Sequence, residues 1–382
     1  MSIATKLAKL KTIKQDIKSA LEEKGQTPSN VFSTYANNIR AIEAGGSGGD
    51  TSQEDGLVTR TLTSYSNDRV NSVGEYTFYN IKTLTNVELP NITSIGTYAF
   101  YNCTSLTNID STKVTFLGQN VFQNCTALLS ASMPLYELNR NGRDSNNLFY
   151  SCSSLKNVYM PKVTRFGSYI FYKCTSLESI DFPLLQTISD SFCRECTNLK
   201  QVNLPKLRLF GSHCFENCTS LTNISLPSGT RFASYCFQNC STLDSVDVGK
   251  LEKIDDYVFV NCYSLKSFTI LNKIKVASLY NTYVFNNCYH ILGTTNATYN
   301  PNGLKDGYIY VPASLLSQYK VATNWSSFAS QIVGHQDYSI GDSLVNYSNS
   351  NYSTCKWYSD KEMTNEVSSV EQNGRYYCRL EV

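Results

Sequence analysis

The residues with the greatest capacity for chemistry are the cysteines, of which the chain has 14 in 382 residues. Cys193 and Cys196 form a C-x-x-C pair, and His213, Cys214 and Cys218 follow shortly afterwards. Thiolates in this spacing bind zinc or exchange disulfides. A metal site or a redox pair is therefore the first chemical hypothesis for this chain.

A structural explanation competes with that hypothesis, because the cysteines recur at one position of a repeated phrase. Examples of the phrase are AFYNCTSL (99–106), IFYKCTSL (170–177) and CFENCTSL (214–221). The additional Cys193 takes the place of a repeated Phe, and Cys214 and Cys236 take the place of Ala99. Position in the repeat explains every one of these thiols, so we predict neither a metal nor another cofactor.

Other catalytic chemistry finds no support in the sequence. The three histidines lie in unrelated contexts, and no G-x-S-x-G, Walker or H-E-x-x-H motif occurs. Four carboxylates share one exposed strand position of the repeat: Glu88, Asp110, Asp181 and Asp247. A solvated acidic face is the simpler interpretation, and a cation or sugar site is the alternative. We predict that the chain is not an enzyme.

The repeat itself is defined by cysteines spaced mostly 22 residues apart, and a fixed period of this size indicates a solenoid. A further unit with Ile81 in the same slot precedes them, which makes ten repeats. Phe stands three residues before the slot, Leu three after it, and often Pro nine after it. The slot cysteines are Cys103, Cys125, Cys152, Cys174, Cys196, Cys218, Cys240, Cys262 and Cys288.

The pattern Leu-x-x-Ile-x-Leu-Pro predicts a short strand that ends at the proline, which has no N–H to continue a ladder. One 22-residue coil cannot bury its own apolar side chains, but stacked coils can. Equivalent residues then form vertical ladders with strands about 4.8 Å apart. In this arrangement the cysteine is a small residue that fills the core.

The combined pattern Leu-x-x-Ile-x-Leu-Pro…Ile-Gly…Ala-Phe-x-x-Cys-x-x-Leu resembles the BspA-like leucine-rich repeats over about residues 60–292. The resemblance implies a mainly β leucine-rich repeat solenoid, which we place at 57–292. Extra residues at 134–149, around NRNGRD, predict a protruding loop. The step into Cys288 has four extra residues around NKIKVASLYN.

The first 45 residues have a helical rather than a repeat pattern. We predict a helical hairpin at 1–43, for attachment or oligomerisation as a homo-oligomer such as a trimer, and a Gly/Ser-rich linker at 44–56. ALEEKGQTPSNVFSTYANNIRAI with its glycine tether resembles modules of bacteriophage tail and fibre proteins, which implies attachment to other virion proteins. The apolar faces comprise Leu7, Leu10, Ile17, Leu21, Phe32, Tyr35, Ile39 and Ile42.

The segment after the last repeat contains a candidate cap. We predict a cap at 293–336, with a strand followed by helical turns, and Trp325, Phe328 and Ile332 over the open end of the stack. GYIYVPASLLSQYKVATNWSSFASQIVG also resembles the segment that closes BspA-like arrays. Residues 337–382 alternate apolar and polar side chains and predict a small β domain. Pairing of Cys355 with Cys378 stays open.

Tyrosines provide the most plausible binding surface, because many of the 27 fall at two positions of the repeat. Stacked tyrosines offer rigid amphipathic area for contact with a protein or a glycan. A ladder that only stiffens the solenoid is the alternative. Five residues before the slot are Tyr76, Tyr98, Tyr169, Tyr235, Tyr257 and Tyr283; two before it are Tyr79, Tyr101, Tyr150 and Tyr172.

Charge and targeting signals limit the cellular roles that the chain can have. A net charge of +2 with interleaved signs predicts no nucleic-acid partner, and no apolar run predicts a signal peptide or membrane insertion. We expect a phage virion protein, in the tail or a fibre, made in the host cytoplasm, whose solenoid contacts a bacterial surface protein or glycan. The alternative is a BspA-like surface adhesin or a cytoplasmic scaffold.

Overall fold

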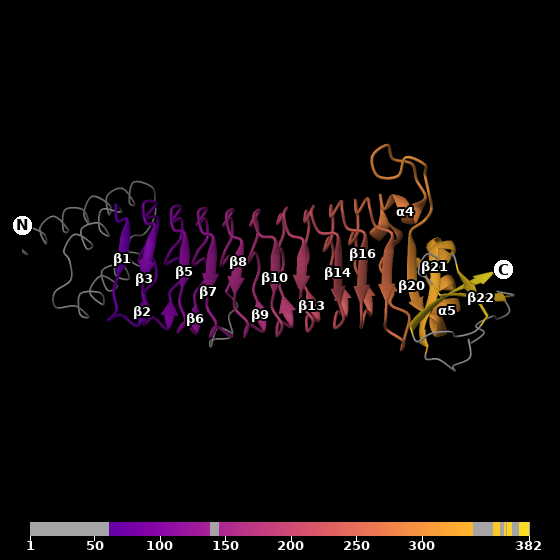
Figure 1. The fold of residues 1–382 in the computed structure, drawn as a ribbon, viewed down its shortest axis with the longest axis horizontal. Helices are drawn as coiled ribbons and strands as arrows, with labels where there is room; N and C mark the ends of the chain where they lie inside the picture. Colours follow the sequence, from indigo (N-terminus) through magenta and orange to yellow (C-terminus); the bar gives the residue numbers. More distant parts are fainter. Residues whose placement is uncertain are drawn as a thin grey trace, which may run out of the picture.

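The computed structural model describes residues 61–137, 145–338, 354–359, 363, 365–368 and 374–381. These residues form an elongated stack of similar coils, with strands in parallel rows along the long axis (Figure 1). The mainly β solenoid predicted from the repeat is confirmed. The helical hairpin, the linker and most of the insertion around NRNGRD lie outside the described residues.

The first row of strands comes from the Leu-x-x-Ile segment of each repeat. Most neighbouring strands pair in parallel at the repeat spacing, as in Ile180↔Val202 and Ile224↔Val246. The row comprises β1 (Ser64–Ser66), β3 (Asn86–Glu88), β5 (Asn108–Asp110), β7 (Ser130–Ser132), β8 (Asn157–Tyr159), β10 (Ser179–Asp181), β12 (Gln201–Asn203), β14 (Asn223–Leu226), β16 (Ser245–Val248) and β18 (Ser267–Ile270).

A second row of two-residue strands follows the turn after the proline. Register is kept here too, with Ile188 opposite Phe210 and Phe232 opposite Ile254. The row comprises β2 (Ser72–Val73), β4 (Ser94–Ile95), β6 (Phe116–Leu117), β9 (Arg165–Phe166), β11 (Thr187–Ile188), β13 (Leu209–Phe210), β15 (Arg231–Phe232), β17 (Lys253–Ile254) and β19 (Ser278–Leu279). The remainder of each coil consists of tight turns.

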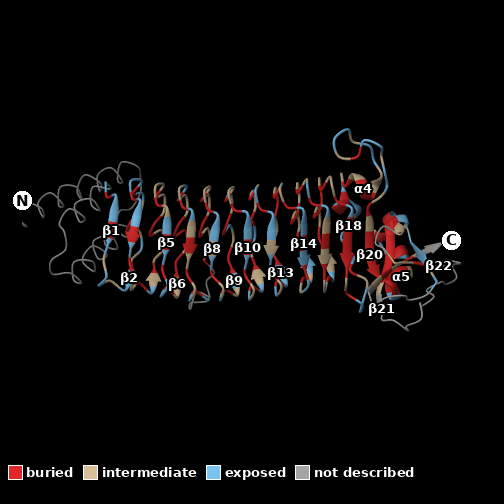
Figure 2. Cartoon of the chain, in the orientation of Figure 1, coloured by how far each residue is buried: buried red, intermediate tan, exposed pale blue. Residues whose placement is uncertain are grey.

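The core runs through the centre of the stack, and buried and exposed residues alternate along its walls (Figure 2). Phenylalanines of successive coils stack inside it, for example Phe100 on Phe122 and Phe237 on Phe259. Each coil thus buries its apolar face against its neighbours, because it has too few residues to form a core alone.

The C-terminal segment closes the stack with strands and short helices. After η1 (Thr282–Phe285) and α4 (Tyr289–Leu292), β20 (Tyr308–Pro312) pairs in parallel with β18, and β21 (Ile332–Tyr338) pairs with β20. Between them lie η2 (Ala313–Leu315), α5 (Leu316–Val321) and η3 (Trp325–Gln331). Trp325, Phe328 and Ile332 are all buried, as expected for a cap.

The last strands continue the same sheet. β24 (Gly374–Glu381) pairs antiparallel with β21, and β22 (Thr354–Tyr358) pairs with both β24 and β23 (Glu366–Val367). In this register Cys355 is opposite Leu380 and Cys378 is opposite Trp357, so the two cysteines are not direct cross-strand neighbours. At the other end of the stack, β1 precedes the ten repeats and pairs with β3 in a separate two-stranded sheet.

Candidate binding surface

The nine slot cysteines are all fully buried. Each thiol donates a hydrogen bond to a backbone carbonyl of the preceding coil, over sulfur–oxygen distances of 3.0 to 3.2 Å. The acceptors are the carbonyl oxygens of Phe78, Phe100, Phe122, Phe149, Phe171, Cys193, Phe215, Phe237 and Phe259, in the order of the cysteines.

The thiol completes the hydrogen bonding of a carbonyl that already closes a turn. The oxygen of Phe171 accepts the N–H of Cys174 at 3.0 Å and the Sγ–H of Cys196 at 3.0 Å. A carbonyl oxygen has two lone pairs, and both are used. Burial also raises the pKa of the Cys174, Cys218 and Cys262 thiols well above the ordinary value, which keeps them protonated.

These thiols are therefore donors within the fold rather than nucleophiles or ligands. Within the described ranges, no group of three His, Cys, Asp or Glu side chains is arranged to hold a metal ion. The C-x-x-C pair follows the same rule, because Cys196 bonds to the carbonyl of Phe171 and Cys193 is buried in the phenylalanine column.

A second ladder, which the sequence analysis missed, lies one residue before the slot. Asn239 donates to Asn217 at 2.9 Å, and Asn261 donates to Asn239 at 2.6 Å. These asparagines have φ near +60°, a region that Asn tolerates better than most residues because its short side chain bonds locally. The recurring Asn before Cys was the available signal for this left-handed turn.

The predicted tyrosine columns lie on this turn-rich side of the coils. In the column five before the slot, Tyr76 stacks on Tyr98 at 5.2 Å, and Tyr235 stacks on Tyr257 at 5.2 Å. In the other column, Tyr79 stacks on Tyr101 at 5.0 Å. Edge contacts such as Tyr98 with Tyr101 at 5.5 Å join the two columns, so they form one aromatic surface.

The stacking restricts what this surface can present. Parallel rings cover one another's faces, so ring edges and hydroxyl groups point to solvent along most of the ladder. The largest exposed areas in the two columns belong to Tyr169, at 39%, and Tyr283, at 57%. Every tyrosine of the first column except Tyr283 has positive φ. This backbone conformation costs about 1–2 kcal/mol per residue and offsets the gain from stacking.

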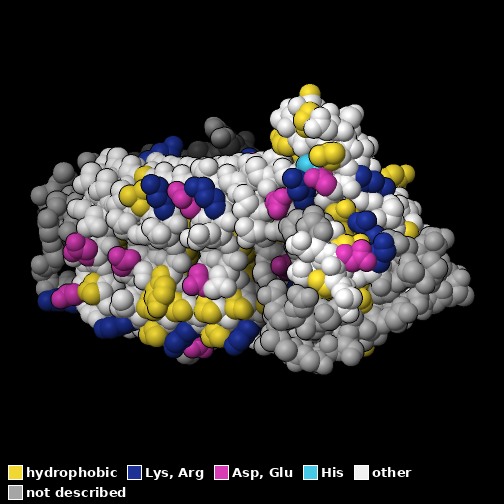
Figure 3. Space-filling model, turned by 45° about the vertical axis from the view of Figure 1, so that its right-hand side comes forward, with side chains coloured by type: hydrophobic (Ala, Val, Ile, Leu, Met, Phe, Trp, Pro, Cys, Tyr) yellow, Lys and Arg dark blue, Asp and Glu magenta, His cyan; other side chains and the backbone are white. Residues whose placement is uncertain are grey.

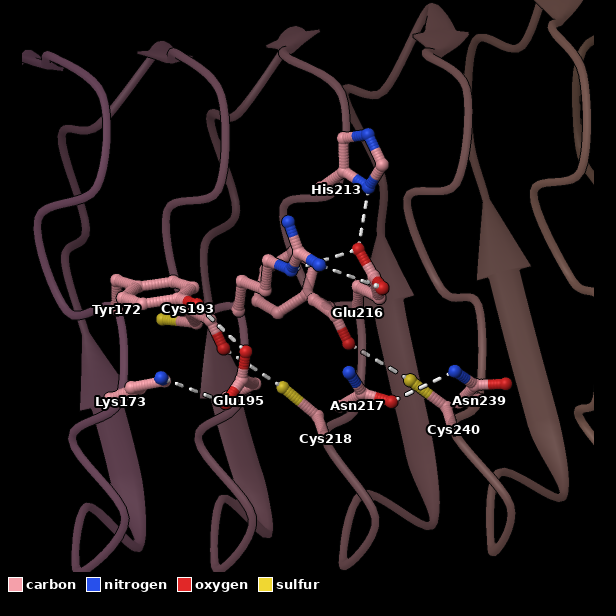
Figure 4. Close-up of polar contacts among 12 residues, drawn as sticks. Tyr172, Lys173, Cys193, Glu195, His213, Glu216, Asn217, Cys218, Asn239 and Cys240 are labelled. Carbon is pink, nitrogen blue, oxygen red and sulfur yellow. Dashed lines mark hydrogen bonds and ion pairs between the residues drawn. The ribbon is translucent and has the colours of Figure 1, made fainter.

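A charged cluster interrupts the tyrosines in the middle of the stack (Figure 4). The Tyr172 hydroxyl donates a hydrogen bond to Glu195 at 2.8 Å, and Lys173 lies 3.8 Å from the same carboxylate. Glu216 is buried between Arg194, at 3.0 Å, and His213, which replaces a tyrosine and stacks on Tyr235. The tyrosine surface is thus divided into segments by a hydrogen-bonded ionic patch.

The acidic column lies on the strand face, at a distance from the tyrosines along each coil. Glu88, Asp110 and Asp181 are exposed, and Asp181 accepts a hydrogen bond from Asn203 at 2.8 Å. Tyr159 and Ser132 occupy the same position in neighbouring coils, which separates the charges. The arrangement is that of a solvated strand face.

Comparison with known proteins places the chain in a family. The model for the BspA type leucine rich repeat region matches in six copies over residues 61–177, 144–230 and 164–292. This range covers more than half of the chain, and the chain belongs to that family. No curated protein sequence matches the chain.

Three solved structures of leucine-rich repeat proteins are similar in part. A protein of T. pallidum is 24% identical over 46% of this chain and 72% of its own, with a TM-score of 0.33. One from Bacteroides ovatus is 20% identical over 69% and 82%, with a TM-score of 0.40. A cell surface protein of Faecalibacterium prausnitzii is 22% identical over 58% and 63%, with a TM-score of 0.32.

The fold and the family together define a repeat protein suited to protein binding or adhesion. The described helices are too short or too polar to cross a membrane.

Proposed function

We propose that the solenoid is an adhesion module that binds a bacterial surface protein or glycan through its tyrosine columns. The observation that supports this most directly is the continuous aromatic surface formed by Tyr76, Tyr79, Tyr98 and Tyr101. Tyrosine is favoured in binding surfaces because it gives large contact area at a low cost in conformational entropy.

The exposed ring edges of the tyrosines determine which contacts this surface can make with a ligand. A row of hydroxyl groups donates and accepts hydrogen bonds, whereas stacking on a sugar ring requires an exposed ring face. Tyr169 and Tyr283 are the positions with most ring area available, so they serve as the anchors of the interface. The accessible members of the ionic patch, Lys173 and Glu195, supply polar contacts between them.

This function is tested with the double variant Tyr169→Ala/Tyr283→Ala in the full chain. The probes are immobilised peptidoglycan, lipopolysaccharide, teichoic acid and extracted surface proteins, with binding measured by surface plasmon resonance. The wild type should bind at least one probe, and the double variant should bind it at least tenfold more weakly, as expected for aromatic anchors.

Tyr280→Ala is the matched control, because Tyr280 is 62% exposed and lies outside both columns. It should bind like the wild type. A wild-type chain that binds none of the probes, or a double variant with unchanged affinity, contradicts the proposal.

As to cellular context, we propose that the chain is a phage tail or fibre protein attached through residues 1–43 to other virion proteins, with self-association as a homo-oligomer. The support is the apolar stripe, the glycine tether and the resemblance of that segment to phage modules, all at the level of sequence. Mass spectrometry of purified particles should detect the chain. Its absence from particles and its presence on the bacterial envelope would favour the alternative adhesin.

A further inference from the structure

A row of lysines and leucines lies along the corner where the first strand row turns into the second. The row occupies the position that follows the repeated proline, ten residues after the slot. We call it the lysine–leucine ridge, and its members are Lys113, Leu135, Lys162, Leu184, Lys206 and Lys250, with Ser228 between the last two.

The stacking register creates this alternation. β7 pairs with β8 and β10 with β12, so Leu135 aligns with Lys162, and Leu184 aligns with Lys206. Lysines therefore recur in every second coil, about 9.6 Å apart for a strand spacing of about 4.8 Å. In the sequence these residues are separated by 22 or more positions, and no basic run is visible.

The lysines of the ridge are available to a ligand. All four are exposed, and among the described residues Lys206 and Lys250 form no ion pair. Lys113 donates a hydrogen bond to the amide oxygen of Asn91, at 2.7 Å, and Lys162 lies 3.6 Å from the exposed Glu137. Arg208, two residues after Lys206, is exposed as well and adds to the positive charge.

Apolar side chains are exposed beside these charges. Leu135 and Leu184 are 40% and 37% exposed, and Tyr159 and Leu209 flank the ridge with 58% and 54%. Figure 3 shows Lys and Arg side chains along the lower margin of the molecule with hydrophobic side chains directly beside them. Leucines beside exposed lysines on a rigid straight edge suit a surface that has anionic groups outside and an apolar layer beneath.

We propose that the lysine–leucine ridge docks on an anionic lipid bilayer, with the lysines on lipid phosphates and Leu135 and Leu184 in the interfacial layer. This contact lies on the surface and needs no membrane-spanning segment. It is independent of the tyrosine columns, which lie on another side of the coil. Nearby acidic groups are Glu137, paired with Lys162, Glu252, paired with Lys275, and Asp181, bonded to Asn203. Asp110 and Asp247 hold the repeat position of Asp181, three residues before Lys113 and Lys250.

The experiment measures partition of the full chain onto phosphatidylcholine vesicles with and without one quarter phosphatidylglycerol. We expect binding to the anionic vesicles only, weaker at higher salt. Each lysine near an anionic surface contributes about fivefold in affinity, so Lys162→Gln/Lys206→Gln should lower partition about 25-fold. Leu135→Ser/Leu184→Ser should lower it about tenfold, because two partly buried leucines are lost.

The matched control is Lys156→Gln/Lys200→Gln. These exposed lysines lie in the same two coils, six residues nearer the slot, and their replacement changes the net charge equally. The control should keep partition within about threefold of the wild type, and circular dichroism checks the fold of every variant. No binding to anionic vesicles, or equal losses in the control, overturns the proposal. Tight binding to dextran sulfate with no effect of the leucine variant also overturns it and assigns the ridge to a soluble polyanion.

Discussion

At the scale of single residues, the slot cysteine combines three properties that few residues share. It is small enough for an interior corner, apolar enough to be fully buried, and still able to donate a hydrogen bond. Cys240 meets all three conditions, since it is buried and its thiol lies 3.0 Å from the carbonyl oxygen of Phe215. Alanine would leave that lone pair without its donor, and serine would bury a more strongly polar hydroxyl.

The buried thiols predict a specific dependence of stability on pH. Burial raises the pKa of Cys240 to about 12, and that of Cys262 well above its usual range. Because the folded pKa exceeds the unfolded one, the stabilisation is complete below pH of about 9. It decreases as the pH rises from there toward 12, by up to about 1.4 kcal/mol per pH unit for each thiol. Urea unfolding between pH 7 and 11 measures this slope.

The control for this prediction is Cys240→Ala/Cys262→Ala, compared at the same pH values. The variant is less stable at pH 7, because two donors and some packing are lost. Its free energy of unfolding should decrease less steeply above pH 9. An identical slope in both proteins would show that groups other than these two thiols control the alkaline transition.

At the scale of the element, each coil depends on two turns with left-handed backbone. The asparagine ladder stabilises one of them by joining successive coils, with Asn239 bonded to Asn217 on one side and to Asn261 on the other. The residue is half-buried, so these bonds are partly shielded from water. The left-handed backbone and the side-chain hydrogen bonds between coils both favour asparagine, which explains why Asn recurs at this position.

Substitutions at Asn239 separate the two contributions. Asn239→Ala removes both ladder bonds and places a Cβ-bearing residue without a local hydrogen bond at φ of +60°, and should cost about 2 kcal/mol. Asn239→Gly removes the bonds but adopts this φ without steric strain, and should cost about half as much. Chemical denaturation measures both, and a glycine variant less stable than the alanine variant would contradict the argument.

At the scale of the whole molecule, the solenoid is a one-dimensional stack in which each coil contacts its neighbours only. The ends are therefore decisive, because a terminal coil has an uncovered core face. Trp325 covers the C-terminal end, with its indole N–H bonded to the carbonyl of Ala277 at 2.7 Å and its ring against Tyr319. Tyr319 itself bonds to the N–H of Ala277 at 2.8 Å.

Loss of this cap should act locally first. Trp325→Ala is expected to destabilise the cap by about 3–5 kcal/mol, because it leaves a cavity and a buried carbonyl without a donor. Hydrogen exchange should then increase strongly in β18 and β19 and only slightly in β5, since coupling decreases along a stack. Equal increases in exchange along the whole solenoid would instead indicate one cooperative unit.

The 22-residue period by itself determined the fold class, the core columns and the structural role of the cysteines. It did so because every coil repeats one set of contacts, so a residue's column specifies its burial. The cap residues were predictable for a related reason, since a stack needs an apolar end cover. The recurring Asn before the slot was the sequence signal for the left-handed turns, but the period alone does not specify the backbone conformation.

Only the tertiary structure decided how surface side chains meet across coils. The covered ring faces of the tyrosines, the ionic patch around Glu216 and the lysine–leucine ridge all join residues that are 22 or more positions apart. Their contacts depend on side-chain direction and on the exact register between strands. Surface positions vary from coil to coil, so no single repeat contains the information, and the pattern exists only once the coils are stacked.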